Sequence, residues 1–342
     1  MSNLERAIAA LRAGRVVRLG ALTLLALETG SAAMLDLLDP DHRGELLISG
    51  ARAAALGLGN RRAAGDGEAP VRIARCAWLD RDAALALADP GRDLDRGPLG
   101  PLDPREPPAE ASAALKLARL AGLLPALWLL DPASEASATL DPAEVDAPPR
   151  ATIVARANLP LDDLPPSQMI AFRDDASGEA HVALLVGAFA GQPPLVRLHS
   201  ECLTGDVFGS LKCDCGPQLK TALGILGAEG GGILLYLRQE GRGIGIANKL
   251  RAYALQDRGL DTVDANRRLG FADDERDYAM AAAMLRALGI DTVRLLTNNP
   301  AKVAGLEREG IAVVERIAHH MPVNPHNADY LATKASRSGH LR

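Results

Sequence analysis

The sequence is poor in aromatic residues, since Phe, Tyr and Trp make up 3% of its 342 residues. Proteins that bind single-stranded nucleic acid stack the bases on aromatic side chains, so this chain does not suit that class. The formal net charge is -5 at pH 7 and the sequence pI is about 5.8, which argues against a general nucleic-acid binder. We therefore expect no nucleic-acid partner.

The sequence also lacks long apolar runs. No run reaches about 18 consecutive apolar residues, so no transmembrane helix is predicted. The N-terminus, MSNLERAIAALRAGR, has the pattern of an amphipathic helix and not that of a signal peptide. These absences predict a cytoplasmic protein with no membrane partner, a setting in which disulfides are rare.

The length and composition are sufficient for two domains. With 48% hydrophobic and 24% charged residues, each half of the chain can bury a core. Residues 131–150 are rich in Pro, Ala and acidic residues and have little to bury, so we place a linker at 141–150. The first domain is then 1–140 and the second 151–342.

Short apolar strands and helical patterns alternate in both domains, which predicts an α/β (α+β) fold for each. In the first domain we expect strands at 16–19 and 22–28, further apolar pieces at 45–48, 51–58 and 71–78, and helices near the N-terminus and at 111–123. In the second domain we expect strands at 152–155, 169–173, 181–189, 194–198, 233–237, 292–296 and 311–314, and helices at 218–229, 277–288 and 302–310.

Three of the four cysteines fall in HSECLTGDVFGSLKCDC (199–215), as Cys202, Cys213 and Cys215. On a flat strand the sulfurs of a Cys-x-Cys pair lie about 7 Å apart, so only a turn can bring them together. Gly205, Gly209 and Gly216 supply flexible chain nearby. Three thiolates without a fourth Cys or an obvious His indicate a zinc site with one position left for water. A disulfide with a spare thiol, or three unconnected buried cysteines, are the alternatives.

The segment RQEGRGIG (238–245) has the features of a phosphate-binding turn. Its three glycines let the backbone approach an anion, and the helix that follows offers free N–H groups. The alternative is an ordinary tight turn with a solvated basic face, because the spacing matches neither a dinucleotide fingerprint nor a P-loop. Cations and carboxylates are nearly balanced between 197 and 302, which suits one polyphosphate better than a long polyanion.

Two further polar segments follow predicted apolar elements. The acidic run in GFADDERDY (270–278) is either part of a site or the start of a helix, where carboxylates are favoured. The residues TNNP (297–300) come directly after a predicted strand, where α/β folds bind ligands, although a helix cap explains them equally.

Four stretches resemble GTP cyclohydrolase II in their sequence, order and spacing, and the resemblance runs from about residue 151 to 342. The stretches are HSECLTGDVFGSLKCDCG, LLYLRQEGRGIGIANKLRAYALQD, LGFADDERDY and LLTNNPAKV. The resemblance implies hydrolysis of GTP to 2,5-diamino-6-(5-phosphoribosylamino)pyrimidin-4-one, formate and pyrophosphate, the first step of riboflavin biosynthesis. A homologue that stops at a formamidopyrimidine, or a non-catalytic zinc-stabilised nucleotide-binding regulator, are the alternatives.

The resemblance also implies a set of site residues. The zinc ligands are Cys202, Cys213 and Cys215, and the catalytic residues are Tyr253 in ring opening, Asp274 as general base and Arg276 at the α-phosphorus. An arginine is a poor nucleophile, so Arg276 is the more natural stabiliser of phosphoryl charge. The family contacts to GTP fall on Arg197, Leu198, His199, Ser200, Glu201, Gln218, Glu240, Gly241, Arg242, Thr262, Thr297 and Lys302. Mg²⁺ on the triphosphate and a homodimer are further expectations.

The N-terminal stretch LERAIAALRAGRVVRLG is similar to the opening of 3,4-dihydroxy-2-butanone-4-phosphate synthase. That family continues with an acidic run that binds magnesium and the sugar phosphate. Here the corresponding region is ALTLLALETGSAAML, in which Glu28 is the only acid before Asp36. We therefore expect a degenerate, non-catalytic domain that serves as scaffold, dimer surface or regulator.

Overall fold

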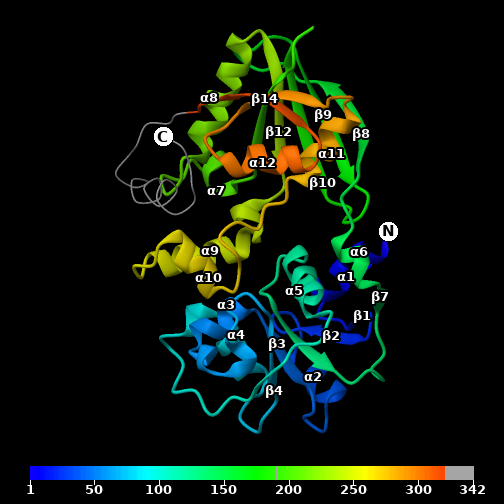
Figure 1. Cartoon of the computed structure of the whole chain (residues 1–342), viewed down its shortest axis with the longest axis vertical. Helices are drawn as coiled ribbons and strands as arrows, with labels where there is room; N and C mark the ends of the chain where they lie inside the picture. Colours follow the sequence, from blue (N-terminus) through cyan, green and yellow to red (C-terminus); the bar gives the residue numbers. More distant parts are fainter. Residues whose placement is uncertain (190, 320–342) are drawn as a thin grey trace. The chain divides into compact units, whose positions relative to one another are not determined.

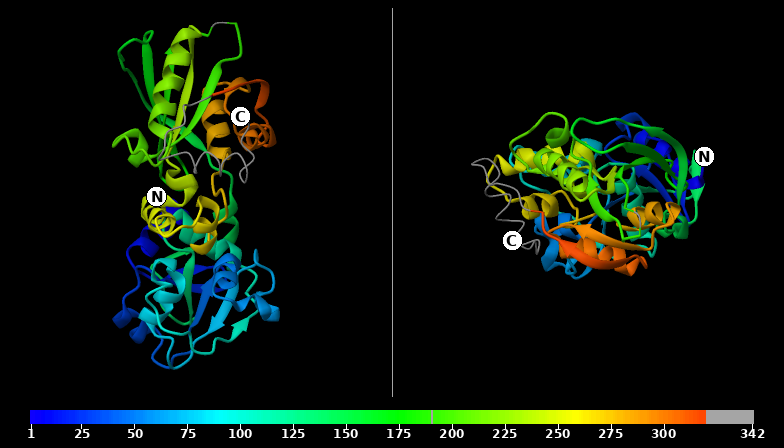
Figure 2. Two further views of the ribbon diagram at one scale, coloured as in Figure 1. Left: turned by 90° about the vertical axis from the view of Figure 1, so that its left-hand side faces the viewer. Right: turned by 90° about the horizontal axis from the view of Figure 1, so that it is seen from above.

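A computed structural model describes residues 1–189 and 191–319 (Figure 1, Figure 2). The chain folds into two compact units. Unit 1 comprises Met1–Ala147 together with Ile244–Glu275, and unit 2 comprises Pro148–Gly243 together with the described residues from Arg276 to His319. The division at 147/148 lies inside the predicted linker, whereas residues 244–275, predicted to lie in the second domain, pack with unit 1.

Unit 1 is built on a seven-stranded sheet. In spatial order its strands are β5 (Pro104–Arg105), β4 (Val71–Ala74), β3 (Glu45–Ile48), β6 (Ala126–Leu130), β2 (Leu22–Ala26), β1 (Val17–Leu19) and β7 (Ala138–Leu140). Neighbouring strands are antiparallel except β1 and β7, which are parallel. The helices are α1 (Asn3–Arg12), α2 (Ala32–Leu38), α3 (Gly50–Ala55), α4 (Arg81–Ala88), α5 (Ala111–Leu120), α6 (Pro142–Asp146), α9 (Gly245–Gln256) and α10 (Thr262–Arg268), with short 3-10 turns η1 (Leu58–Asn60), η2 (Arg62–Ala64) and η3 (Pro90–Arg92).

The first helix shows how local signals set an element's bounds. The Ser2 side chain accepts a hydrogen bond from the Glu5 N–H at 2.9 Å and so caps α1. The helix ends before Gly14, whose φ is +65° and whose added Cβ would lie 2.4 Å from the Thr29 carbonyl oxygen. Both the left-handed backbone and the close approach require glycine there, and the helix does not continue past it.

Residues 131–150 are more ordered than their composition predicts. β7 extends the sheet by pairing with β1, and α6 begins with a capping box formed by Asp141 and Glu144. Val145 of α6 is 3% exposed, and the Asn3 side-chain amide donates to the Glu144 carboxylate at 3.1 Å. Most of the segment predicted to be a linker is therefore part of unit 1, because its few apolar residues have a place in the core.

Unit 2 is built on a second seven-stranded sheet, with the order β14 (Ala312–Ile317), β13 (Thr292–Leu296), β11 (Leu195–Ser200), β12 (Gly231–Leu237), β10 (Ala180–Gly187), β9 (Ser167–Asp174) and β8 (Ala151–Asn158). β11 to β14 are mutually parallel, whereas β8, β9 and β10 are antiparallel to their neighbours. The helices are α7 (Leu203–Asp206), α8 (Cys215–Ala228), α11 (Ala279–Ala287) and α12 (Pro300–Arg308), with the 3-10 turn η4 (Glu240–Gly243).

Both faces of this sheet are covered, which explains the continuously apolar sequence of β12. Ile233 and Leu235 pack in the cluster that includes Leu285 of α11, whereas Leu234 packs in the cluster that includes Leu226 of α8. Figure 2 shows α8 lying along the sheet. The carboxyl ends of the parallel strands β11, β12, β13 and β14 meet at one edge, which is where ligands bind in such sheets.

The predicted α/β fold class with two domains is confirmed, since each unit contains a mixed sheet. The acidic run does not start a helix, because residues 271–277 are irregular and α11 begins at Ala279. Within the described residues, no helix has both the length and the apolar character that crossing a bilayer demands.

Candidate active site

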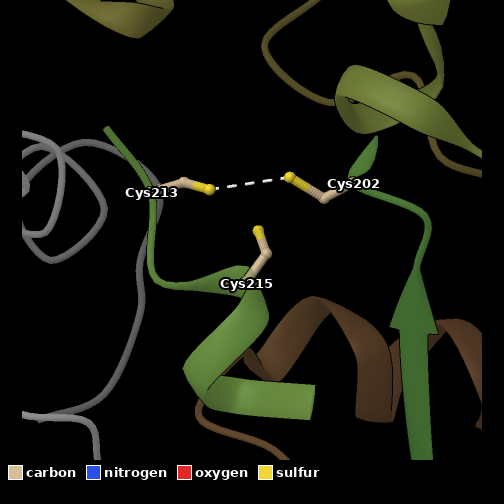
Figure 3. A group of neighbouring side chains, drawn as sticks. All are labelled: Cys202, Cys213 and Cys215. Atoms are coloured by element: carbon tan, nitrogen blue, oxygen red, sulfur yellow. Dashed lines mark hydrogen bonds between the residues drawn. The ribbon is translucent and has the colours of Figure 1, made fainter. Parts of the chain in front are cut away.

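Three cysteine side chains of unit 2 point toward one another (Figure 3). Cys202 follows β11, Cys213 lies in the connection to α8, and Cys215 is the first residue of α8. The sulfur atoms of Cys202 and Cys213 are 3.6 Å apart, and all three sulfurs lie within 4.8 Å of one another. The strand end and the helix start therefore supply the turn that a Cys-x-Cys pair needs.

These distances distinguish between the interpretations of the cysteine array. A disulfide has a sulfur–sulfur distance of about 2.05 Å, and the cysteines here are free. Three sulfurs at about 2.3 Å from a tetrahedral zinc ion would lie about 3.8 Å apart, close to the observed spacing. The three cysteines are thus neither disulfide-bonded nor unconnected, and they fit a zinc ion.

Two glycines permit this convergence. A Cβ added at Gly205 would lie 2.7 Å from the Cys213 sulfur and 3.1 Å from the Cys202 sulfur, and one at Gly216 would lie 2.3 Å from the Gly205 carbonyl oxygen. Neither glycine has a positive φ. Their role is thus close approach rather than the flexibility that the sequence suggested.

The thiols are poor acids in the absence of a cation. Hydrogen bonds with Cys202 and Cys213, together with burial, raise the pKa of Cys215 well above its ordinary value. The hydrogen bond with Cys202 also raises the pKa of Cys213. A thiolate beside two other sulfurs in a buried place is disfavoured, and a divalent cation at their centre relieves that cost. The donor set therefore fits zinc in its charge as well as in its spacing.

A carboxylate behind the cysteines organises their surroundings. Asp206 Oδ2 accepts hydrogen bonds from the Cys202 N–H at 3.0 Å and the Tyr236 hydroxyl at 2.8 Å, and His199 Nε2 lies 3.0 Å away. Asp206 and His199 are both 3% exposed, and the His199 ring stacks on that of Tyr236. Burial lowers the pKa of His199, although Asp206 acts in the opposite direction. This network fixes the backbone of the first cysteine.

Buried cations lie at the carboxyl edge of the sheet in unit 2. The Arg197 guanidinium donates to the Gln218 side-chain oxygen at 2.7 Å and to the Leu296 carbonyl oxygen at 3.0 Å. Burial lowers its pKa to about 10. Lys302 Nζ donates to the Leu198 carbonyl oxygen at 2.7 Å, and Thr297 is 1% exposed. These predicted GTP contacts come together at the ends of β11 and β13.

The other predicted contacts of unit 2 lie after β11 and β12. Glu240 accepts from the Leu203 N–H at 2.7 Å and so joins the turn after β12 to the helix after Cys202. Glu201 pairs with Arg238 at 3.4 Å, and the buried Ser200 hydroxyl has no hydrogen-bond partner in the described structure. A buried hydroxyl without a partner is suited to a ligand.

The glycine-rich bend has a left-handed backbone. Gly241, Arg242, Gly243 and Gly245 have φ values of 63°, 63°, 93° and 82°. Such a conformation is unfavourable for a residue with a Cβ, so Arg242 is held there by its surroundings. Ile244 has right-handed backbone angles and Gly245 a positive φ, and such a pair makes a concavity suited to an anion. The strain in this bend is confined to Arg242, because its glycine neighbours adopt a positive φ readily.

The remaining predicted residues are distributed between the units. Tyr253 lies on α9 with its ring centre 5.7 Å from Lys249 Nζ, and the Thr262 hydroxyl lies 3.3 Å from the Gln256 amide nitrogen. Asp274 lines a cavity of about 940 Å³ in unit 1. Arg276 belongs to unit 2, with its guanidinium carbon 6.0 Å from the Tyr278 ring centre. Tyr253, Thr262 and Asp274 are thus in a different unit from the cysteines, and their roles stay predictions.

Two residues were missed by the sequence prediction. Asp206 sits between the first two cysteines, so its position in the motif was an available signal. His319 follows β14, is 3% exposed, and has no hydrogen-bond partner for either ring nitrogen among the described residues. Its backbone is held by two hydrogen bonds with the Asn298 side chain, and burial lowers its pKa to about 3. Nothing in the sequence distinguishes this histidine.

Comparisons with known proteins agree with the motifs. The family model for GTP cyclohydrolase II matches residues 152–318. GTP cyclohydrolase-2 of Azospirillum brasilense is 44% identical over 366 aligned positions, covering 100% of this chain and 94% of that protein. GTP cyclohydrolase-2 of Azotobacter vinelandii is 59% identical over 51% of this chain and 84% of its own.

A solved structure of a two-domain 3,4-dihydroxy-2-butanone 4-phosphate synthase from A. baumannii aligns with 94% of this chain and 100% of its own. Its TM-score of 0.30 and its 15% identity are too low to indicate a shared fold. The full-length relative and the motif geometry carry the assignment instead. The chain belongs to the GTP cyclohydrolase II family of enzymes.

Proposed function

We propose that the protein hydrolyses GTP to 2,5-diamino-6-(5-phosphoribosylamino)pyrimidin-4-one, formate and pyrophosphate, using a zinc ion bound by Cys202, Cys213 and Cys215. The observation that carries the proposal is the convergence of three cysteine sulfurs, from two buried residues and one half-buried residue, with no further His, Cys, Asp or Glu in the group, as far as the described chain extends. Three protein ligands leave a fourth position open for water or substrate, as in catalytic rather than structural zinc sites.

A zinc ion held there would supply Lewis-acid activation of water for attack on the ring carbon between the two imidazole nitrogens. Residues of the chain would hold the site together and bind the substrate. Asp206 holds the Cys202 backbone, and the buried Arg197 and Lys302 side chains provide positive charge at the sheet edge. A polyanion such as a triphosphate, accompanied by Mg²⁺, offsets that charge.

The remaining roles follow from the motif matches to the family. We propose that GTP is contacted by Arg197, Leu198, His199, Ser200, Glu201, Gln218, Glu240, Gly241, Arg242, Thr262, Thr297 and Lys302. Tyr253 takes part in ring opening and Asp274 acts as general base. Arg276 stabilises charge on the α-phosphoryl group, since a guanidinium stays protonated and is a poor nucleophile. The active form is a homodimer.

Replacing one zinc ligand tests the proposal. We expect Cys213→Ser to abolish formate release from GTP and to reduce bound zinc from about one ion per chain to near zero, because a neutral hydroxyl is a much weaker ligand than a thiolate. The measurements are formate production and metal analysis of the purified protein. Cys76→Ser is the matched control, since Cys76 is a free cysteine of unit 1, and it should retain both. Formate release at the wild-type rate by Cys213→Ser would contradict a catalytic zinc.

A second test addresses the carboxylate behind the cysteines. In the wild type, the Asp206 carboxylate faces three donors: the Cys202 N–H, the Tyr236 hydroxyl and His199 Nε2. Asp206→Asn replaces one carboxylate oxygen by an N–H, which cannot accept from them, so we expect zinc affinity to fall about 10- to 100-fold. Tyr236→Phe removes one of those donors and should have a smaller effect. Affinity is measured by competition with a chelator, with Asp291→Asn on the exposed surface as control. Equal affinities for Asp206→Asn and wild type would show that Asp206 does not support the metal.

We further propose that the first domain has no synthase activity, because Glu28 is the only acid in its stretch and is already paired with Arg251 at 2.7 Å. Incubation with ribulose 5-phosphate and magnesium should yield no formate. Formate formation in that assay, with GTP absent, would show that the domain is catalytic.

A further inference from the structure

Residues Ile244–Glu275, which we name the motif segment, share a hydrophobic core with the first half of the chain. Leu255 of α9 and Phe271 are 3% and 1% exposed, and they pack in the same cluster as Ile48 and Trp128 of the unit 1 sheet. Apolar burial of this kind is the main stabilising contribution to a folded segment. The position of the motif segment is therefore set by residues far away in the sequence.

Glu28 connects the unit 1 sheet to α9. Its Oε2 accepts from the Leu124 N–H at 2.9 Å, and its Oε1 accepts from Arg251 Nη2 at 2.7 Å. Arg251 Nη1 in turn donates to Asn248 Oδ1 at 2.7 Å, and the Asn248 amide donates to the Ile244 carbonyl oxygen at 2.9 Å. A continuous chain of hydrogen bonds thus runs from the start of β6 to the first turn of α9.

Further contacts hold the distal half of the motif segment. The buried Arg52 donates to the Arg268 carbonyl oxygen at 3.3 Å while its guanidinium pairs with Asp93 at 2.6 Å. Gly270 has φ +88°, and a Cβ there would lie 2.6 Å from the Ser49 hydroxyl oxygen. Arg119 pairs with Glu275 at 3.3 Å, directly after Asp274. The backbone on both sides of Asp274 is therefore constrained by residues of the N-terminal half.

We propose that residues 1–147 position the motif segment for catalysis, and that Glu28 is a positioning residue for Tyr253. Arg251 and Tyr253 are two positions apart, which corresponds to a rotation of about 200° around an α-helix. An anchor at Arg251 therefore holds one side of α9 and directs Tyr253 to the opposite side. Because Tyr253 and Asp274 are catalytic only under the function proposed above, the kinetic part of this role rests on that function.

The Glu28 contact is suited to positioning rather than to global stability. The side chains of Glu28 and Arg251 are 20% and 25% exposed, so solvent screens part of their ion pair, and a glutamine in place of Glu28 would keep the side-chain size and one carbonyl acceptor. Loss of the carboxylate charge should thus loosen α9 locally without unfolding unit 1. The zinc ligands belong to unit 2, so bound zinc should not change.

Glu28→Gln in the full-length protein tests the proposal by two readouts. Hydrogen–deuterium exchange in residues 245–256 should become about fivefold faster, with no change in residues 231–237. The kcat for formate release should fall about 10- to 100-fold while the KM for GTP changes less than about threefold. Arg251→Gln should behave alike, and the double variant should be no worse than the poorer single one.

The matched control is Glu45→Gln, because Glu45 is also a partly exposed, ion-paired glutamate of unit 1, bound to Arg72 and Arg105. Glu45→Gln should change neither the exchange rate of residues 245–256 nor the kcat for formate release. Unchanged exchange in residues 245–256 of Glu28→Gln overturns the proposal whether or not the protein is active. Unchanged kcat in an active protein also overturns it. Absence of formate release from the wild type instead counts against the proposed function. The hydrogen–deuterium exchange measurement then decides whether Glu28 positions α9.

Discussion

The convergence of three cysteine sulfurs is the constraint on which the site in unit 2 depends. Cys202, Cys213 and Cys215 come from a strand end, a connection and a helix start, and they meet only because Gly205 has no side chain at the point of contact. Burial and mutual hydrogen bonding disfavour ionisation of these thiols in the absence of a cation. A metal ion among the sulfurs would therefore favour the ionised form, and the cysteines lie beside the edge where parallel sheets bind ligands.

The polar groups around the sulfurs are buried as well, and each has hydrogen-bond partners. Asp206 is buried, yet its carboxylate has three donors, and Arg197 and Lys302 are buried with backbone carbonyl acceptors. Both cations donate hydrogen bonds to backbone carbonyl oxygens, which carry no formal charge. Buried cations of this kind suit the anionic substrate that we propose, because charge-assisted hydrogen bonds to an anion are strong.

Much of the fold could be predicted from the sequence, because β12, α8 and their neighbours in unit 2 have clear periodic patterns with glycine at their ends. The cysteine cluster could also be predicted, since three cysteines so close in the sequence favour a shared metal ion. Three features could not. The roles of β7 and α6 depend on partners distant in sequence, the motif segment packs against a core formed by the first half, and His319 is set apart only by burial without a partner for its ring among the described residues. Each of these is decided by tertiary contacts, which local patterns do not encode.

The most direct test of the central claim is X-ray absorption at the zinc edge of the purified protein. We expect three sulfur neighbours at about 2.3 Å and one nitrogen or oxygen neighbour at about 2.0–2.1 Å. Four sulfur neighbours, or no zinc together with a sulfur–sulfur bond, would contradict it.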